Sequence, residues 1–168
     1  TLQNLAQAGI NVVCYNFMPV FDWTRTELAK TLPDGSQVLA YDARILRDLT
    51  PEKMAAKMQQ DAKGVMLTGW EKERLQSLQL LFDKYKHIDE DALFANLGYF
   101  LRAIIPLAET CGIKMAIHPD DPPWSVFGLP RITTCQANLQ RIVDLVDSPS
   151  NGLTLCSGSL GANPANDI

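Results

Sequence analysis

The chain has 168 residues, of which 46% are hydrophobic and 20% charged, and its formal net charge is −4. This length is sufficient for one domain with its own core. The small negative charge provides no basic surface for nucleic acid and no polybasic patch for a membrane. We therefore expect neither a nucleic-acid partner nor a membrane, the latter also because no run of about 18 apolar residues is present.

The four cysteines are widely spaced and form neither a CxxC motif nor a dense disulfide framework. Cys14 lies in an apolar, strand-like run and Cys111 at the end of an apolar, helix-like run. We expect both to be buried reduced thiols, which are common in protein cores. Reduced thiols predict a cytoplasmic location.

The first part of the chain predicts one helix, one strand and a long excursion. Helical spacing runs up to Gly9, a residue type that often follows a helix. Ile10–Phe17 is a short apolar run typical of a buried strand. A turn is expected at Pro33-Asp34-Gly35 and a helix start at Thr50-Pro51-Glu52. The stretch 18–90 exceeds an ordinary βα loop of about 2–6 residues, so we expect a helical lid or insertion.

Two apolar stripes follow and predict helices at Glu71–Tyr85 and Asp91–Cys111. Pro106 should kink or break the second helix, because proline lacks the backbone N–H that a helix interior uses. Further elements are predicted in this order: a strand at Lys114–Ile117, a helix at Thr134–Val146 with a capping box of Thr133 and Gln136, a turn at Asn151-Gly152 and a strand at Leu153–Leu155.

The predicted strands are apolar throughout rather than alternating, which indicates a parallel sheet covered on both faces. Three strands cannot close a barrel, because closure takes about eight. The chain is therefore either a small open α/β domain or a single partial domain, residues 1–168, of a larger barrel. Both ends have the form of cut ends, since Thr1 opens within a helix and Ile168 closely follows a strand. This favours the partial barrel.

His118 and Cys156 follow two successive predicted strands that a helix connects. The carboxyl ends of such strands are where α/β folds place their chemistry. Both side chains can bind a metal ion, and together they predict one metal site. Taken singly, each has a simpler interpretation, as a structural histidine or a core thiol. Two donors do not complete a site, which needs three or four.

Polar residues beside these two predict contacts with a substrate. Asp120 and Asp121 can supply a carboxylate, or can simply form a turn through local backbone hydrogen bonds. Ser157 and Ser159 suit recognition of hydroxyl groups. The loop around them lacks the lysine and the full pattern of a phosphate-binding loop, so we reject nucleotide binding there.

The end of the first strand offers a second group of candidates. Asn16 ends the apolar run, and Trp23 and Arg25 follow it closely. An arginine can bind a carboxylate through two parallel hydrogen bonds, so this group suits a polyol carboxylate. The alternative is an ordinary loop around a buried tryptophan.

Three long motifs carry a resemblance to the D-mannonate dehydratases of bacterial hexuronate catabolism. They are VCYNFMPVFDWTRT (Val13–Thr26), IHPDDPPWSVFGLPRI (Ile117–Ile132) and SPSNGLTLCSGSLG (Ser148–Gly161). The motifs occur in the family's order, with PDGS (Pro33–Ser36) and GWEKERL (Gly69–Leu75) between the first two. The chain resembles the central part of the family's sequence.

The resemblance implies a TIM-type (β/α)8 barrel, of which this chain supplies about three strands and a helical insertion. It implies a hydro-lyase that converts D-mannonate to 2-keto-3-deoxy-D-gluconate with Mn²⁺ or Fe²⁺. His118 and Cys156 fall on two of the family's metal ligands. The family's other ligands, a histidine and an aspartate, and its acid and base lie later than Ile168. We accordingly expect this chain by itself to be inactive.

The implied partner is a small sugar acid, and the resemblance leaves a homo-oligomer open. Two alternatives remain at this point. One is another metal-dependent, TIM-barrel enzyme that resembles sugar isomerases, and the other is a non-catalytic α/β interaction domain. An assay with mannonate and ketose substrates distinguishes a mannonate dehydratase from the first alternative. Tight metal binding argues against the second.

Overall fold

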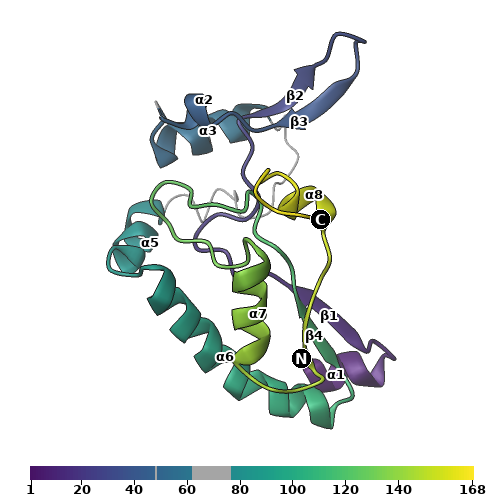
Figure 1. Ribbon diagram of the computed structural model, residues 1–168. Helices are drawn as coiled ribbons and strands as arrows, with labels where there is room; N and C mark the ends of the chain where they lie inside the picture. The colour runs from purple at the N-terminus through teal and green to yellow at the C-terminus, as the bar shows by residue number, and fades with distance from the viewer. Residues whose placement is uncertain (48, 62–76) are drawn as a thin grey trace. The chain divides into compact units, whose positions relative to one another are not determined.

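The computed structural model describes residues 1–47, 49–61 and 77–168. These residues divide into two compact units. One unit combines Thr1–Pro19 with Ile88–Ile168, and the other is Val20–His87. The first unit contains a three-stranded parallel sheet with helices, and the second contains a two-stranded hairpin with helices (Figure 1).

The sheet of the first unit consists of β1 (Val12–Tyr15), β4 (Lys114–Ile117) and β5 (Asn151–Leu153). Its order is β1-β4-β5, and both pairs are parallel. The parallel pairing of three strands is confirmed, and β4 has the predicted bounds, whereas β5 shares only Leu153 with the predicted strand Leu153–Leu155. The predicted turn at Asn151-Gly152 is wrong, because β5 already begins at Asn151.

Asn151 starts a strand because its side chain binds the end of the preceding helix, α7 (Gln136–Asp144). Its Nδ2 donates to three backbone carbonyl oxygens, at 3.1 Å from Ile142, 3.3 Å from Val143 and 3.1 Å from Val146. The last carbonyls of a helix have no partner within the helix and need such donors. A buried amide therefore joins α7 to β5.

The ends of two helices of this unit follow the sequence signals closely. α1 (Leu2–Gln7) is followed by Gly9, whose φ of 77° lies in the left-handed region that glycine tolerates. α6 (Glu90–Thr110) begins at Asp89, whose carboxylate accepts a hydrogen bond from the amide of Ala92. α6 continues through Pro106, so a break at this proline, one of the two predicted outcomes, is wrong.

α6 is long and apolar enough to cross a membrane by length and composition alone. The sequence-based exclusion of a membrane segment on apolar length is therefore not supported for this helix. One stripe of α6 is buried inside the protein, which is typical of a core helix. The buried residues are Leu93, Phe94, Leu97, Gly98, Leu101, Ile105 and Ala108.

The predicted capping box of α7 is wrong. The helix begins at Gln136, after Cys135, and no side chain caps it. Thr133 lies in the loop before α7, and its buried hydroxyl has no hydrogen-bond partner among the residues that the structure describes. Its backbone N–H donates instead to the Asp120 carboxylate, and its carbonyl oxygen accepts from the Asp120 amide.

α6 and α7 lie next to each other on one side of β1 and β4 (Figure 1). Arg141 on α7 joins them, with its guanidinium 2.8 Å from the Asp91 carboxylate and 3.8 Å from the centre of the Phe94 ring. On the sheet face toward these helices, Met115 and Ile117 are buried.

The opposite face of the sheet is open in this structure. Val12 is 54% exposed, and Cys14 is also exposed. Successive residues of a strand point to opposite faces, so every second residue of β1 lies on the open side. The predictions of a sheet covered on both faces and of a buried Cys14 are thus wrong for this structure, and Cys111 is only half-buried.

The second unit contains β2 (Glu27–Thr31) and β3 (Gln37–Ala40), which pair antiparallel. The turn between them is the predicted one, where the Asp34 carboxylate accepts hydrogen bonds from the amide and hydroxyl of Ser36. The hairpin was not predicted within the insertion 18–90, for which only helices were expected. Its residues are mostly exposed, so the apolar alternation that marks a half-buried strand is absent.

The remaining helices of this unit are α2 (Ala43–Arg47), α3 (Pro51–Asp61) and α5 (Leu78–Tyr85). The predicted helix start at Thr50-Pro51-Glu52 is confirmed, with the Thr50 hydroxyl accepting from the amide of Lys53 at 3.3 Å. The predicted helix start at Glu71 lies outside the described residues, and α5 begins at Leu78, after Ser77, within the predicted range.

In the first unit, a short helix, α8 (Ser157–Leu160), follows Cys156 and ends at Gly161. A Cβ atom added to Gly161 would lie 2.6 Å from the carbonyl oxygen of Ser157. This distance is shorter than real Cβ contacts, so only glycine fits without a backbone shift. A Cβ atom added to Gly158 meets nothing within 4 Å.

We expect Asn151→Asp to lower the free energy of unfolding by about 1–3 kcal/mol or more. The change keeps the shape of the side chain but replaces its NH₂ donor with an oxygen that faces three carbonyl oxygens. Asn163→Asp is the matched control, because the side-chain oxygen of Asn163 already acts as the acceptor, from the amide of Ala165. Urea unfolding measures both, and equal effects would contradict the assignment.

We expect Gly161→Ala to destabilise the protein by about 1–3 kcal/mol, the usual cost of forcing an atom into a packed site. Gly158→Ala should be neutral or stabilise by up to about 1 kcal/mol, since alanine favours a helix more than glycine does. Thermal unfolding of the two variants compares them directly. A Gly161→Ala protein as stable as Gly158→Ala would show that the close approach to Ser157 is unimportant.

Candidate functional site

His118 directly follows β4 at the carboxyl edge of the sheet. Its backbone amide donates to the carbonyl oxygen of Tyr15 at 2.6 Å, which extends the pairing of β4 with β1. Its ring Nδ1 lies 2.7 Å from the carbonyl oxygen of Pro119. A carbonyl oxygen can only accept, so Nδ1 carries a hydrogen, and in the neutral ring Nε2 then presents its lone pair. This arrangement is typical of metal-binding histidines.

Cys156 lies beyond β5, just before α8, and is half-buried. Its Sγ is 3.3 Å from the Ser159 hydroxyl. Hydrogen bonds from the Ser159 side chain and backbone, followed by the His118 side chain, lower the pKa of the Cys156 thiol below its ordinary value. A lowered pKa favours the thiolate, which is the form that binds metals.

The structure brings His118 and Cys156 together. The His118 side chain lies near enough to the Cys156 thiol to help lower its pKa, so the ring and the thiol approach each other. Thr154 marks the same face of the sheet, with its hydroxyl 3.3 Å from both the Cys14 Sγ and the carbonyl oxygen of Ala116. His118 and Cys156 each lie two residues beyond this level, so the alternation of side chains turns both to that face.

An imidazole nitrogen and a thiolate are donors that Fe²⁺, Zn²⁺ and related ions accept. Within residues 1–47, 49–61 and 77–168, no group of three or more His, Cys, Asp and Glu side chains could hold a metal ion. The donor chemistry therefore fits part of a metal site, with two ligands from this region of the fold.

Asp120 lies two residues after His118 and is almost entirely buried, with an exposed fraction of 1%. Its Oδ2 accepts hydrogen bonds from the amides of Ile132 and Thr133, both at 2.8 Å. Burial raises the pKa of the Asp120 carboxyl above its ordinary value, whereas Arg131 and these two amides act in the opposite direction. The carboxylate thus binds the far end of its own loop.

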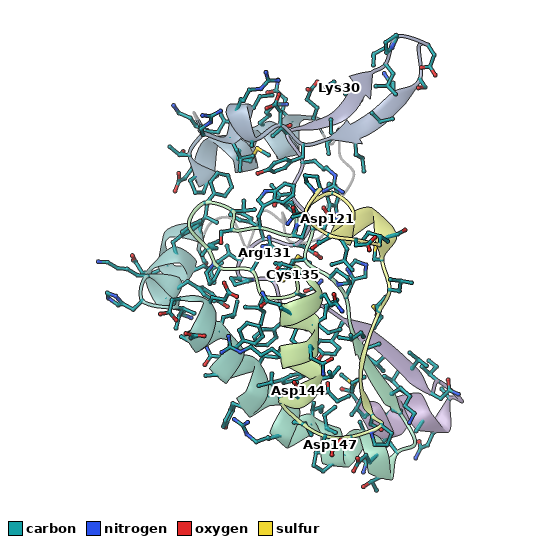
Figure 2. All side chains as sticks on the ribbon, viewed as in Figure 1. Lys30, Asp121, Arg131, Cys135, Asp144 and Asp147 are labelled. Carbon is teal, nitrogen blue, oxygen red and sulfur yellow. The ribbon has the colours of Figure 1, made fainter. Side chains whose placement is uncertain are left out.

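Arg131 was not recognised as a site residue from the sequence. Its guanidinium Nη1 lies 3.9 Å from Asp120 Oδ1, and both side chains are 1% exposed. It belongs to the loop before α7, together with Cys135 (Figure 2). The available signal was an arginine placed within the apolar stretch Leu129–Ile132, where a charge needs a partner.

The other candidates of this unit differ in exposure. Ser159 is buried, and its hydroxyl lies against Cys156, so it stabilises the thiolate as described above. Ser157 is exposed at the start of α8. Asn16 is exposed and directly follows β1. All three thus lie just beyond the carboxyl ends of parallel strands.

Trp23 and Arg25 belong to the second unit and contact each other. The Arg25 guanidinium carbon lies 5.3 Å from the centre of the Trp23 ring, within the range of a cation–π interaction. Its Nη1 also donates to the carbonyl oxygen of Thr24 at 2.9 Å. The ring and the carbonyl together hold the charged group in one orientation.

A family model described as D-mannonate dehydratase (UxuA) matches residues 1–168. Mannonate dehydratase of Geobacillus thermodenitrificans is 60% identical over all of this chain, which covers 45% of that relative. The enzyme of Thermotoga petrophila is 55% identical, again over the whole chain and 47% of the relative.

The crystal structure of mannonate dehydratase from Streptococcus suis superimposes with a TM-score of 0.81 at 45% identity. The match covers 99% of this chain and 42% of that structure. The chain therefore spans less than half the length of the relatives that it matches. Since the family model covers every residue, the chain belongs to the D-mannonate dehydratase family.

Proposed function

We propose that this chain supplies part of the active site of a metal-dependent hydro-lyase that dehydrates D-mannonate to 2-keto-3-deoxy-D-gluconate. The approach of Cys156 to His118 at one edge of a parallel sheet carries the proposal. Membership of the family supports the choice of substrate. The proposal includes a TIM-type barrel, to which this chain contributes the strands β1, β4 and β5.

In this proposal, His118 Nε2 and the Cys156 thiolate hold a divalent ion, Mn²⁺ or Fe²⁺. The thiolate favours Fe²⁺, because sulfur is a softer ligand than Mn²⁺ usually prefers. The hydrogen bond from Nδ1 to Pro119 keeps the ring in the form that offers Nε2. A histidine and an aspartate from later in the family's sequence complete the set.

The reaction removes a proton from C2 and the hydroxyl from C3, so one water leaves and the resulting enol becomes the 2-keto product. The C2 proton is only weakly acidic, since it lies next to a carboxylate. A divalent ion bound at the site supplies Lewis-acid stabilisation of the negative charge that develops on that carboxylate. We assign the base and the acid to no residue of this chain.

The remaining candidates bind and orient the substrate. Arg25 grips the carboxylate through two parallel hydrogen bonds, and Trp23 limits the freedom of the guanidinium. Asn16, Ser157 and Ser159 recognise hydroxyl groups of the sugar acid. The segment 18–90, which contains Trp23 and Arg25, acts as an insertion or lid.

We further propose that the enzyme works in the cytoplasm, where thiols stay reduced. The four cysteines are all free, which supports this location. A homo-oligomer also remains part of the proposal.

We expect His118→Ala and Cys156→Ala each to lower kcat by about 100-fold or more, on the scale of losing one electrostatic stabiliser. Charge on the substrate is greatest near the transition state, so losing a ligand affects kcat more than binding. Arg25→Ala should mainly raise KM, because Arg25 binds the carboxylate equally in the substrate complex and in the transition state. Keto-acid formation from mannonate by the full-length protein measures all three. Near-normal kcat in Cys156→Ala would leave only His118 as a ligand.

Removal of divalent metal from the full-length protein with a chelator should abolish dehydration, and Mn²⁺ or Fe²⁺ should restore it. Mg²⁺ should restore little, because it prefers oxygen ligands to a thiolate. Keto-acid formation with mannonate is compared with turnover of a ketose substrate under the same conditions. Full activity after chelation, or a preference for the ketose, would contradict the proposed reaction.

A further inference from the structure

We propose that Asp120 is a positioning residue, which orients the His118 ring by locking the peptide unit between Pro119 and Asp120. This inference rests on the proposed function, because it gives the orientation of His118 a purpose. It assigns to Asp120 a role different from the substrate contact that the sequence indicates. The argument depends on contacts within one loop, residues 118–133.

The peptide unit between Pro119 and Asp120 is held at both of its polar ends. Its carbonyl oxygen accepts the hydrogen bond from His118 Nδ1 at 2.7 Å. Its N–H, which belongs to Asp120, donates to the carbonyl oxygen of Thr133 at 2.9 Å. A peptide unit is planar, so fixing the N–H also fixes the direction of the carbonyl that faces the ring.

The Asp120 side chain holds the other side of the same connection. Its Oδ2 receives the amides of Ile132 and Thr133 at 2.8 Å, which are short bonds to a charged acceptor. Its Oδ1 lies 3.9 Å from the Arg131 guanidinium. Three backbone hydrogen bonds and one ion pair therefore join Asp120 to residues 131–133. We call this set of contacts the Asp120 clamp.

Burial makes the Asp120 clamp stiff. Asp120, Arg131, Ile132 and Thr133 are all at most 3% exposed. Water cannot replace these hydrogen bonds without opening the loop, so their loss is costly. Asp120 Oδ2 accepts two backbone amides and Oδ1 faces the Arg131 guanidinium, so the buried carboxylate is turned toward its own loop, which favours a role in holding the loop over direct contact with a substrate.

The test is Asp120→Asn in the full-length, metal-free protein. The amide keeps an acceptor for the two backbone N–H groups but removes the charge and turns a donor toward Arg131. We expect Mn²⁺ affinity, measured from the signal of free Mn²⁺ in electron paramagnetic resonance, to fall by about 10- to 100-fold. In the absence of metal, the ¹⁵N spectrum of His118 should lose its single Nδ1–H tautomer.

Asp89→Ala is the matched control. It removes another Asp whose carboxylate accepts a backbone amide, from Ala92 at 2.8 Å, but at the start of α6 and outside the Asp120 clamp. It should lower the melting temperature while leaving Mn²⁺ affinity and the His118 tautomer unchanged. An equal loss of affinity in both variants would show a mere effect of stability and would overturn the inference. Unchanged Mn²⁺ affinity in Asp120→Asn would also overturn it.

Measurements on the wild type decide the matter if Asp120→Asn does not fold. The inference requires an Nδ1–H tautomer at His118 and slow hydrogen exchange at the Asp120 amide. An Nε2–H tautomer or fast exchange at that amide would overturn it. A wild type with these two properties but no Mn²⁺ binding would instead contradict the proposed function, so the two failures are distinguishable.

Discussion

The central strand β4 is hydrogen-bonded to β1 on one side and to β5 on the other, and the geometry of the candidate metal site depends on this pairing. Its register joins Ile117 to Tyr15 and to Leu153. Two further backbone bonds continue the pairing past the strands, from His118 to Tyr15 and from Thr154 to Ile117. Parallel strands end at the same edge, so this register brings His118 and Cys156 together. A shift by one residue would turn their side chains to opposite faces.

Two kinds of polar group lie near this edge of the sheet, and they differ in how deeply they are buried. Asp120 and Arg131 are buried, and a buried charge is tolerated only when it is paired and hydrogen-bonded. The contacts of Asp120 with residues 131–133 join the two ends of the loop and preserve its shape. Cys156 and Ser157 are half-buried or exposed and remain accessible to a ligand. The site thus combines a rigid support with reachable donors, as orientation of metal ligands requires.

Local signals in the sequence predicted much of the secondary structure. The apolar run Lys114–Ile117 is β4, and Thr50-Pro51-Glu52 begins α3. Gly9 follows α1 with a positive φ, as its position after a run of helical spacing indicated. The order of strand, helix and strand also predicted that His118 and Cys156 would share an edge. Each of these features depends on neighbouring residues or on the general rules of parallel sheets.

The predictions from the sequence were wrong where a distant contact determines the local structure. The pair Asn151-Gly152 is typical of a turn, but Asn151 begins β5. Its side-chain amide donates to backbone carbonyls at the end of α7. Thr133 has the spacing of a helix cap, yet Asp120 holds its backbone in a buried loop. The exposed hairpin β2–β3 carries no apolar alternation and was missed.

The sequence by itself determined the family, the parallel strands and the two candidate metal ligands, because these follow from motifs and from periodicity along the chain. Only the tertiary structure decided what Asp120 does. Its partners, residues 131–133, lie more than ten positions away, and their choice depends on how the loop folds back on itself. A carboxylate in a turn and a carboxylate in a buried clamp have the same sequence, and they differ only in which distant donors reach them.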